Sequence, residues 1–118
     1  MLVVEDDNGV RATVVRMLEF LGHSATAVST GSEAERLPDG SAFDAILTDL
    51  HLPDRPGDEV IRRLRQRWPR LHAVIMSGDV DGQELRAGTT AGLWRTLPKP
   101  FDLEQLAAGL QEPPDSSC

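Results

Sequence analysis

Asp44-Ala45-Ile46-Leu47-Thr48-Asp49-Leu50-His51-Leu52-Pro53 is the stretch that decides the fold of this chain. Its apolar run, which begins at Phe43, is typical of a strand covered on both faces, and predicts a strand over residues 43–48. Asp49 stands where this strand ends, and Pro53 marks the loop after it. Ligands bind at the carboxyl ends of the strands in open parallel sheets. Asp49 is therefore a candidate for chemistry, provided that other strands deliver polar residues beside it.

Length and composition indicate one globular domain. The chain has 118 residues, of which 40% are hydrophobic and 26% charged. Its net charge of −7 argues against a nucleic-acid surface over the whole domain, because phosphate binding needs a concentrated basic footprint. No apolar run approaches the length of a membrane span, and no signal peptide precedes the first strand. The single cysteine, Cys118, fits a cytoplasmic location. The abrupt start at Met1 suggests a fragment of a longer protein.

Strand and helix signals alternate five times along the chain. Further strands are expected over residues 1–4, 24–28, 72–76 and 93–97. Helices are expected over residues 8–21 with Asn8 as the cap, 30–37, 58–68, 81–91 as a weak helix, and 102–110 with Asp102 as the cap. Residues 112–118 read as a polar, disordered tail. The alternation predicts an α/β domain with a parallel sheet and helices on both faces, since crossover connections are right-handed.

Polar residues stand at four strand ends that should meet at one edge of this sheet: Glu5-Asp6-Asp7, Asp49, Ser77 and Lys99. Carboxylates brought together repel one another, and a hard divalent cation such as Mg²⁺ removes that cost. A hydroxyl and an ammonium beside them are suited to hold the oxygens of a phosphoryl group. The constellation predicts a magnesium site at which one aspartate accepts a phosphoryl group as an acyl phosphate.

In these motifs the chain resembles the receiver domains of two-component signalling, over residues 1–111. The matching segments are residues 3–7 (VVEDD), 47–53 (LTDLHLP), 76–78 (MSG) and 98–101 (PKPF). The resemblance implies a flavodoxin-like (βα)5 three-layer sandwich with the strand order 2-1-3-4-5. It implies that Asp49 is the phosphoacceptor, supplied by the phosphohistidine of a histidine kinase or a histidine phosphotransfer domain. The acyl phosphate is then expected to shift the conformation of the domain.

The same resemblance assigns roles to the other site residues. Mg²⁺ or Mn²⁺ would be bound by Asp6 and Asp49 directly, by Glu5 through water and by the backbone carbonyl of His51. Ser77 would bond a phosphoryl oxygen, and Lys99, before a cis Pro100, would pair with the phosphate charge. The resemblance implies no contact of this domain with nucleic acid or membrane and leaves a homodimer open. It also implies no turnover beyond self-phosphotransfer and autodephosphorylation. The sequence of residues 78–79 and 93–98 is more similar to that of the C-terminal receivers of hybrid histidine kinases than to that of transcription-factor receivers.

Two departures from the family pattern leave alternatives open. Thr96 stands three positions before Lys99, where receivers usually carry an aromatic switch residue. Trp94 has the same strand parity but lies nearer the strand start, where we expect partial exposure and no switch role. His51 and Asp79 are expected to flank the phosphoryl group and tune its hydrolysis. A degenerate receiver that acts only as a protein-interaction module is one alternative. A phosphatase of the haloacid dehalogenase type is another, disfavoured because it needs an aspartate at position 51.

Overall fold

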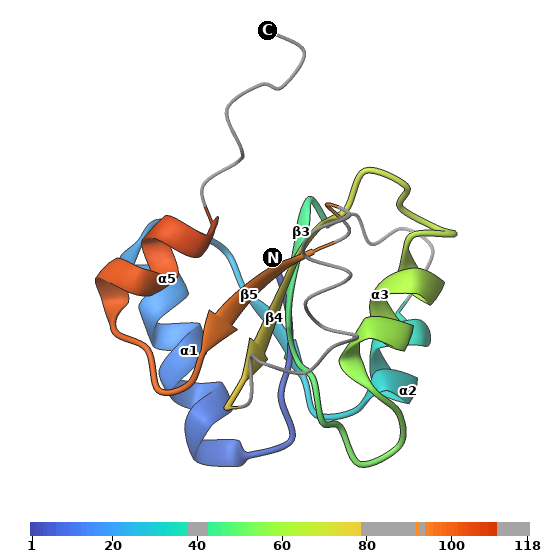
Figure 1. Cartoon of the computed structure of the whole chain (residues 1–118), viewed down its shortest axis with the longest axis horizontal. Helices are drawn as coiled ribbons and strands as arrows, with labels where there is room; N and C mark the ends of the chain where they lie inside the picture. Colours follow the sequence, from blue (N-terminus) through green and yellow to red (C-terminus); the bar gives the residue numbers. More distant parts are fainter. Residues whose placement is uncertain (38–42, 79–91, 93, 111–118) are drawn as a thin grey trace, which may run out of the picture.

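Five strands form one parallel sheet between two layers of helices (Figure 1). The computed structural model describes residues 1–37, 43–78, 92 and 94–110. Within these ranges the elements are β1 (Leu2–Val4), α1 (Asn8–Phe20), β2 (Thr26–Val28), α2 (Gly31–Glu35), β3 (Ala45–Asp49), α3 (Gly57–Leu64), β4 (His72–Ser77), β5 (Arg95–Pro98) and α5 (Leu103–Leu110). The strand order is β2-β1-β3-β4-β5, which confirms the predicted flavodoxin-like topology. Helices α1 and α5 cover one face of the sheet, and α2 and α3 cover the other.

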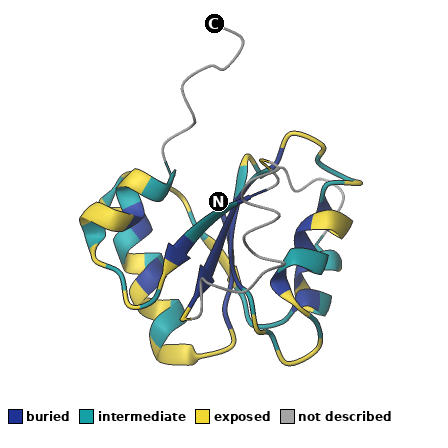
Figure 2. Ribbon diagram, viewed as in Figure 1, coloured by how far each residue is buried: buried dark blue, intermediate teal, exposed yellow. Residues whose placement is uncertain are grey.

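The central strands β1, β3 and β4 are buried on both faces, as the apolar run of β3 predicts. Alternate residues of these three strands enter two separate core clusters. In β1, Leu2 and Val4 pack on the α2–α3 side, whereas Val3 packs on the α1–α5 side. Figure 2 shows buried residues running along the central strands. Within the described ranges, no helix combines the length and apolar character needed to cross a bilayer.

Several boundaries differ from the sequence-based prediction. The cap of α1 is Asp7 rather than Asn8, because the Asp7 carboxylate accepts a hydrogen bond from the Val10 amide at 3.0 Å. Helix α3 begins at Gly57 and ends at Leu64, and a turn continues it to Trp68. Strands β3 and β4 run on to Asp49 and Ser77 themselves. The expected helix over 81–91, Asp79 and the expected tail over 112–118 lie outside the described residues.

The expectation of partial exposure for Trp94 is wrong. Its side chain belongs to the core cluster on the α2–α3 side and is only 4% exposed. The guanidinium of Arg62, on α3, lies over the indole ring at 5.7 Å from its centroid. Trp94 therefore anchors the start of β5 beneath α3.

Candidate functional site

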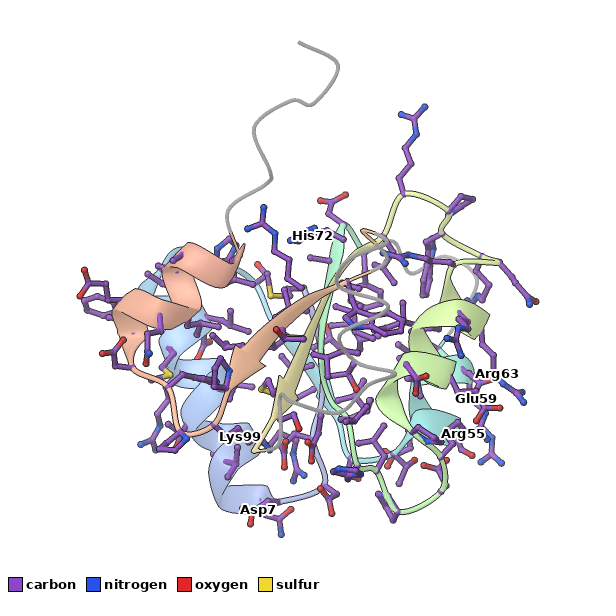
Figure 3. The ribbon with its side chains drawn as sticks, in the orientation of Figure 1. Asp7, Arg55, Glu59, Arg63, His72 and Lys99 are labelled. Atoms are coloured by element: carbon purple, nitrogen blue, oxygen red, sulfur yellow. The ribbon has the colours of Figure 1, made fainter. Side chains whose placement is uncertain are left out.

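The polar residues singled out in the sequence meet at the carboxyl edge of the sheet. Asp49 and Ser77 are the last residues of β3 and β4, Glu5 follows β1 and Lys99 follows β5. Backbone hydrogen bonds continue past the strand ends, from the Leu50 amide to the Met76 carbonyl at 3.0 Å and from the Lys99 amide to the Ser77 carbonyl at 2.9 Å. Figure 3 shows Lys99 and Asp7 at this end of the molecule and His72 at the other. These backbone hydrogen bonds thus fix the Cα positions from which the side chains of the site extend.

Three carboxylates form an acidic group at this edge. Glu5, Asp6 and Asp49 each offer an oxygen, and these atoms all lie within 4.8 Å of one another. Glu5 and Asp49 are buried, whereas Asp6 is exposed. Oxygen donors at this spacing fit a hard divalent cation such as Mg²⁺. Asp7 does not join them, because its carboxylate caps α1.

Lys99 lies between two of these carboxylates. Its Nζ is 2.9 Å from Oε2 of Glu5 and 3.4 Å from Oδ1 of Asp49. Partial burial alone would lower the pKa of Lys99, but the two carboxylates outweigh it and hold the pKa above 10.5. Burial raises the pKa of Glu5 above 4.5, despite the hydrogen bond from Lys99. Lys99 is therefore a cation at neutral pH, and it offsets part of the repulsion between the carboxylates.

Comparison with known proteins decides what this arrangement belongs to. The family model of the response regulator receiver domain matches residues 1–111. The chain belongs to this family. The response regulator MprA of Mycobacterium sp. (strain KMS) is 37% identical over 111 residues, which are 94% of this chain and 48% of the relative. MprA of Mycobacterium avium (strain 104) is 36% identical over 94% of this chain and 49% of its own length. The chain thus spans about half the length of these relatives.

Solved structures agree with the assignment of this receiver domain. The chemotaxis response regulator CheY4 of Vibrio cholerae superposes with a TM-score of 0.82 at 25% identity, over 93% of each chain. The non-phosphorylated HemR receiver domain of Leptospira biflexa gives 0.78 at 31% identity, over 96% of each chain. The BeF3-activated DrrB receiver domain gives 0.77 at 29% identity, over 91% of this chain and 89% of DrrB. Receiver domains bind Mg²⁺ at an acidic pocket and are phosphorylated by histidine kinases. In this chain Glu5, Asp6 and Asp49 form an acidic group, called the acidic pocket below.

The other predicted site residues lie on β4, on β5 and in the loop after β3. Ser77 is buried, and by strand alternation it shares the α2–α3 face of the sheet with Ile75 of β4. Thr96 is half-buried on β5 and pairs in register with Ile75. His51 is exposed and forms an isolated bridge with Pro56 in the loop after β3. The Lys99-Pro100 bond is cis, which confirms that expectation.

Gly57 is a site residue that the sequence analysis missed. A Cβ at this position would lie 2.2 Å from the carbonyl oxygen of Asp49, and the Gly57 amide donates to the Leu50 carbonyl at 2.7 Å. Helix α3 can begin this close to β3 only because residue 57 has no side chain. The signal in the sequence is a glycine directly after Pro56, at the start of a helix, where a residue with a higher helix propensity is otherwise favoured.

An apolar groove opens beside the acidic pocket. It has a volume of about 610 Å³ and runs between α1 and the segment after β5. Lys99 and Asp7 belong to its lining, which connects it with the site. The remaining lining residues are Gly9, Val10, Thr13, Val14, Met17, Pro100 and Phe101.

Proposed function

We propose that Asp49 is the phosphoacceptor of this receiver domain, with Ser77 and Lys99 binding the phosphoryl oxygens. The observation that carries the proposal is the position of Asp49, a buried carboxylate within 3.4 Å of the Lys99 ammonium and grouped with Glu5 and Asp6. A buried carboxylate beside a fixed cation is oriented before the phosphodonor arrives. Less entropy is then lost in bringing the two reacting groups together, which lowers the reaction barrier.

The transfer is a displacement at phosphorus. One oxygen of Asp49 forms the P–O bond while the P–N bond of the donor phosphohistidine breaks, and the histidine nitrogen keeps the bonding electron pair. Lys99 Nζ holds a phosphoryl oxygen close to Asp49, and the hydroxyl of Ser77 donates to another. Glu5, Asp6, Asp49 and the backbone carbonyl of His51 would hold Mg²⁺ or Mn²⁺. That cation would neutralise charge on the phosphoryl oxygens. The acyl phosphate then biases the conformational equilibrium of the domain.

Chemical phosphorylation tests the acceptor. The protein is incubated with Mg²⁺ and acetyl phosphate and its intact mass is measured. We expect one added phosphoryl group, which is absent from Asp49→Asn and from samples with a chelator. Asp44→Asn is the matched control, because Asp44 is exposed and immediately precedes the same strand at its other end. Equal labelling of Asp49→Asn and the wild type would refute the assignment. If neither acetyl phosphate nor a phosphohistidine donor labels the wild type, the phosphoacceptor function is refuted and the alternative of a protein-interaction module is favoured.

We further propose that the phosphohistidine donor, a histidine kinase or a histidine phosphotransfer domain, contacts the groove beside Lys99. The lining of this groove includes Lys99, whose Nζ is 3.4 Å from Asp49, so a donor bound there would bring its phosphohistidine close to Asp49. Thr13 is exposed and lines this groove, whereas Ala12 is exposed on the same helix outside the lining. Thr13→Glu should slow transfer from a phosphorylated donor protein by about tenfold, with labelling by acetyl phosphate unchanged. Equal slowing by Ala12→Glu would contradict a groove-specific contact.

A further inference from the structure

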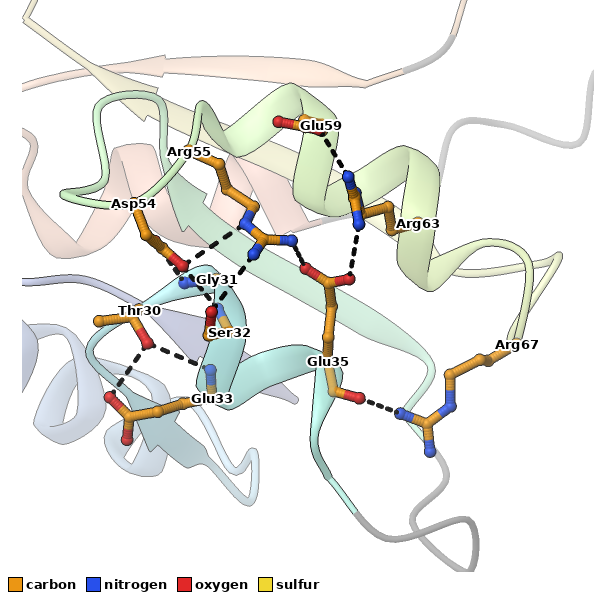
Figure 4. A network of polar contacts seen from close by, with 10 residues as sticks. All are labelled: Thr30, Gly31, Ser32, Glu33, Glu35, Asp54, Arg55, Glu59, Arg63 and Arg67. Atoms are coloured by element: carbon orange, nitrogen blue, oxygen red, sulfur yellow. Dashed lines mark hydrogen bonds and ion pairs between the residues drawn. The ribbon is translucent and has the colours of Figure 1, made fainter.

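The loop after the acceptor strand is tied to α2, the helix that precedes β3 in the sequence. The Asp54 carboxylate accepts hydrogen bonds from the Gly31 amide at 3.1 Å and from the Ser32 amide at 2.8 Å (Figure 4). Partial burial raises the pKa of Asp54, but these hydrogen bonds outweigh it and hold the pKa below 3.8. Asp54 is therefore a carboxylate at neutral pH, and the start of α2 is bonded to the loop through it.

Arg55 adds contacts from the same loop. Its guanidinium forms an ion pair with Glu35, at the end of α2, and donates to Oγ of Ser32 at 3.2 Å. It also lies 3.4 Å from the Asp54 carboxylate. Both Arg55 and Glu35 are largely shielded, with 21% and 25% of their side-chain surface exposed. One loop thus contacts both ends of α2 (Figure 4).

These contacts are more than an ordinary helix cap. Helix α2 already has its own cap, since Thr30 Oγ1 accepts the Glu33 amide at 3.1 Å. The packing at Gly31 is an independent sign of close approach. A Cβ there would lie 2.9 Å from the Arg55 side chain and 2.8 Å from Val60 of α3. Because ion pairs near the surface add little to stability, the contacts are better explained by the position that they impose.

The loop has little freedom to absorb a displacement. Its two ends are joined by the Gly57 amide, which donates to the Leu50 carbonyl at 2.7 Å, and by the bridge between His51 and Pro56. Asp49, which offers an oxygen to the acidic pocket, directly precedes the loop. A shift of Asp54 away from α2 is therefore transmitted to the backbone at residues 49–51.

We propose that Asp54 and Arg55 are positioning residues that brace the acceptor loop against α2 and thereby set the geometry of the cation site at Asp49. The proposal rests on the function proposed above. Mutation of residues that orient ligands without touching the metal typically lowers metal affinity by 10- to 100-fold. Since Asp54 acts through the loop backbone, the lower end of that range applies.

The test measures Mg²⁺ affinity and phosphorylation separately. For the wild type and Asp54→Ala, the Mg²⁺ Kd is obtained from the increase in Tm, and the labelling rate with acetyl phosphate is recorded against Mg²⁺ concentration. Asp54→Ala should raise both the Kd and the Mg²⁺ concentration for half-maximal rate by about tenfold, while the rate at saturating Mg²⁺ returns to that of the wild type. Asp54→Asn keeps one acceptor oxygen and should recover part of the affinity. A merely structural role would lower the Tm in the absence of Mg²⁺ but leave the Mg²⁺ Kd unchanged.

Asp58→Ala is the matched control. It removes a carboxylate that pairs with an arginine, Arg62, at 3.3 Å within α3, and it leaves the loop contacts to α2 intact. We expect its Mg²⁺ Kd to stay within about twofold of the wild type, far from the effect expected at Asp54. An unchanged Mg²⁺ dependence in Asp54→Ala, or an equal change in Asp58→Ala, would overturn the brace. If Asp54→Ala does not fold, Asp54→Asn decides the same comparison. A wild type that is never labelled would instead refute the proposed function.

Discussion

At Gly57 the absence of a side chain lets α3 begin against the backbone of β3. The carbonyl oxygen of Asp49 occupies the space of a Cβ and also accepts the hydroxyl of Thr48 at 3.0 Å. The same carbonyl belongs to the residue whose carboxylate faces Lys99. The backbone at Asp49 is therefore held between Gly57 and Thr48, which are both buried. The starting point of the Asp49 side chain is fixed in consequence.

Gly57→Ala should destabilise the domain by about 1–3 kcal/mol, because an added methyl in a filled space forces the backbone to move. Gly109→Ala, within α5, is the control, since the atom nearest to an added Cβ, Cδ1 of Leu97, would lie 3.7 Å away. There the loss of a helical glycine should stabilise by about 0.5–1 kcal/mol. Urea unfolding of both variants gives the two values. A neutral Gly57→Ala would show that α3 can withdraw from Asp49 without cost.

The meeting of polar residues at one edge of the sheet could be predicted from the sequence, but the contacts between them could not. Glu5, Asp49, Ser77 and Lys99 each stand at a strand end, so the topology alone brings them together. The pairing of Lys99 with Glu5 at 2.9 Å, closer than with Asp49, depends on how deeply Glu5 is buried. The burial of this one carboxylate is a property of the assembled layers, and no local pattern around Glu5 predicts it.

At the scale of elements, β5 shows that tertiary packing can determine a burial that the local sequence does not predict. The strand begins at Arg95, just after Trp94, for which the sequence predicted partial exposure. The short α3 instead lays Arg62 over this ring, and Leu64, Leu71 and Ile61 share its core cluster. The cap of α1 was also predicted wrongly, because it depends on tertiary structure. Asp7 and Asn8 are both good caps, and only the tertiary path of the β1–α1 turn selects Asp7.

Trp94→Ala should cost about 3–5 kcal/mol of stability, as expected for truncation of a buried aromatic residue. Phe20→Ala is the contrasting control on α1, because Phe20 is 78% exposed. Its cost should stay within about 0.5 kcal/mol. Both are measured by urea unfolding with circular dichroism. Similar costs for the two variants would mean that Trp94 does not anchor β5 beneath α3.

At the scale of the whole molecule, the alternation of strands and helices was sufficient for the architecture. Hydrophobic runs define the strands, and right-handed crossovers place the helices on both faces. The strand order was implied by the resemblance to receiver domains, and the sheet has that order. The electrostatic state of the site, in contrast, depends on the assembled fold. A chain with net charge −7 gathers three carboxylates at one edge of its sheet and places one lysine among them.

This arrangement predicts opposite effects of one substitution with and without a cation. Asp6 is exposed, so Asp6→Asn removes charge from the acidic group without opening a cavity. In the presence of a chelator the variant should be as stable as the wild type or more stable, because one repulsive charge is gone. With Mg²⁺ about tenfold above its Kd, binding should add about 1.4 kcal/mol to the wild type, or roughly 5 °C in Tm, and much less to the variant. Glu104→Gln, an equal charge change at an exposed position of α5, should keep the full Mg²⁺ effect. Equal Mg²⁺ stabilisation of Asp6→Asn and the wild type would show that the cation binds elsewhere.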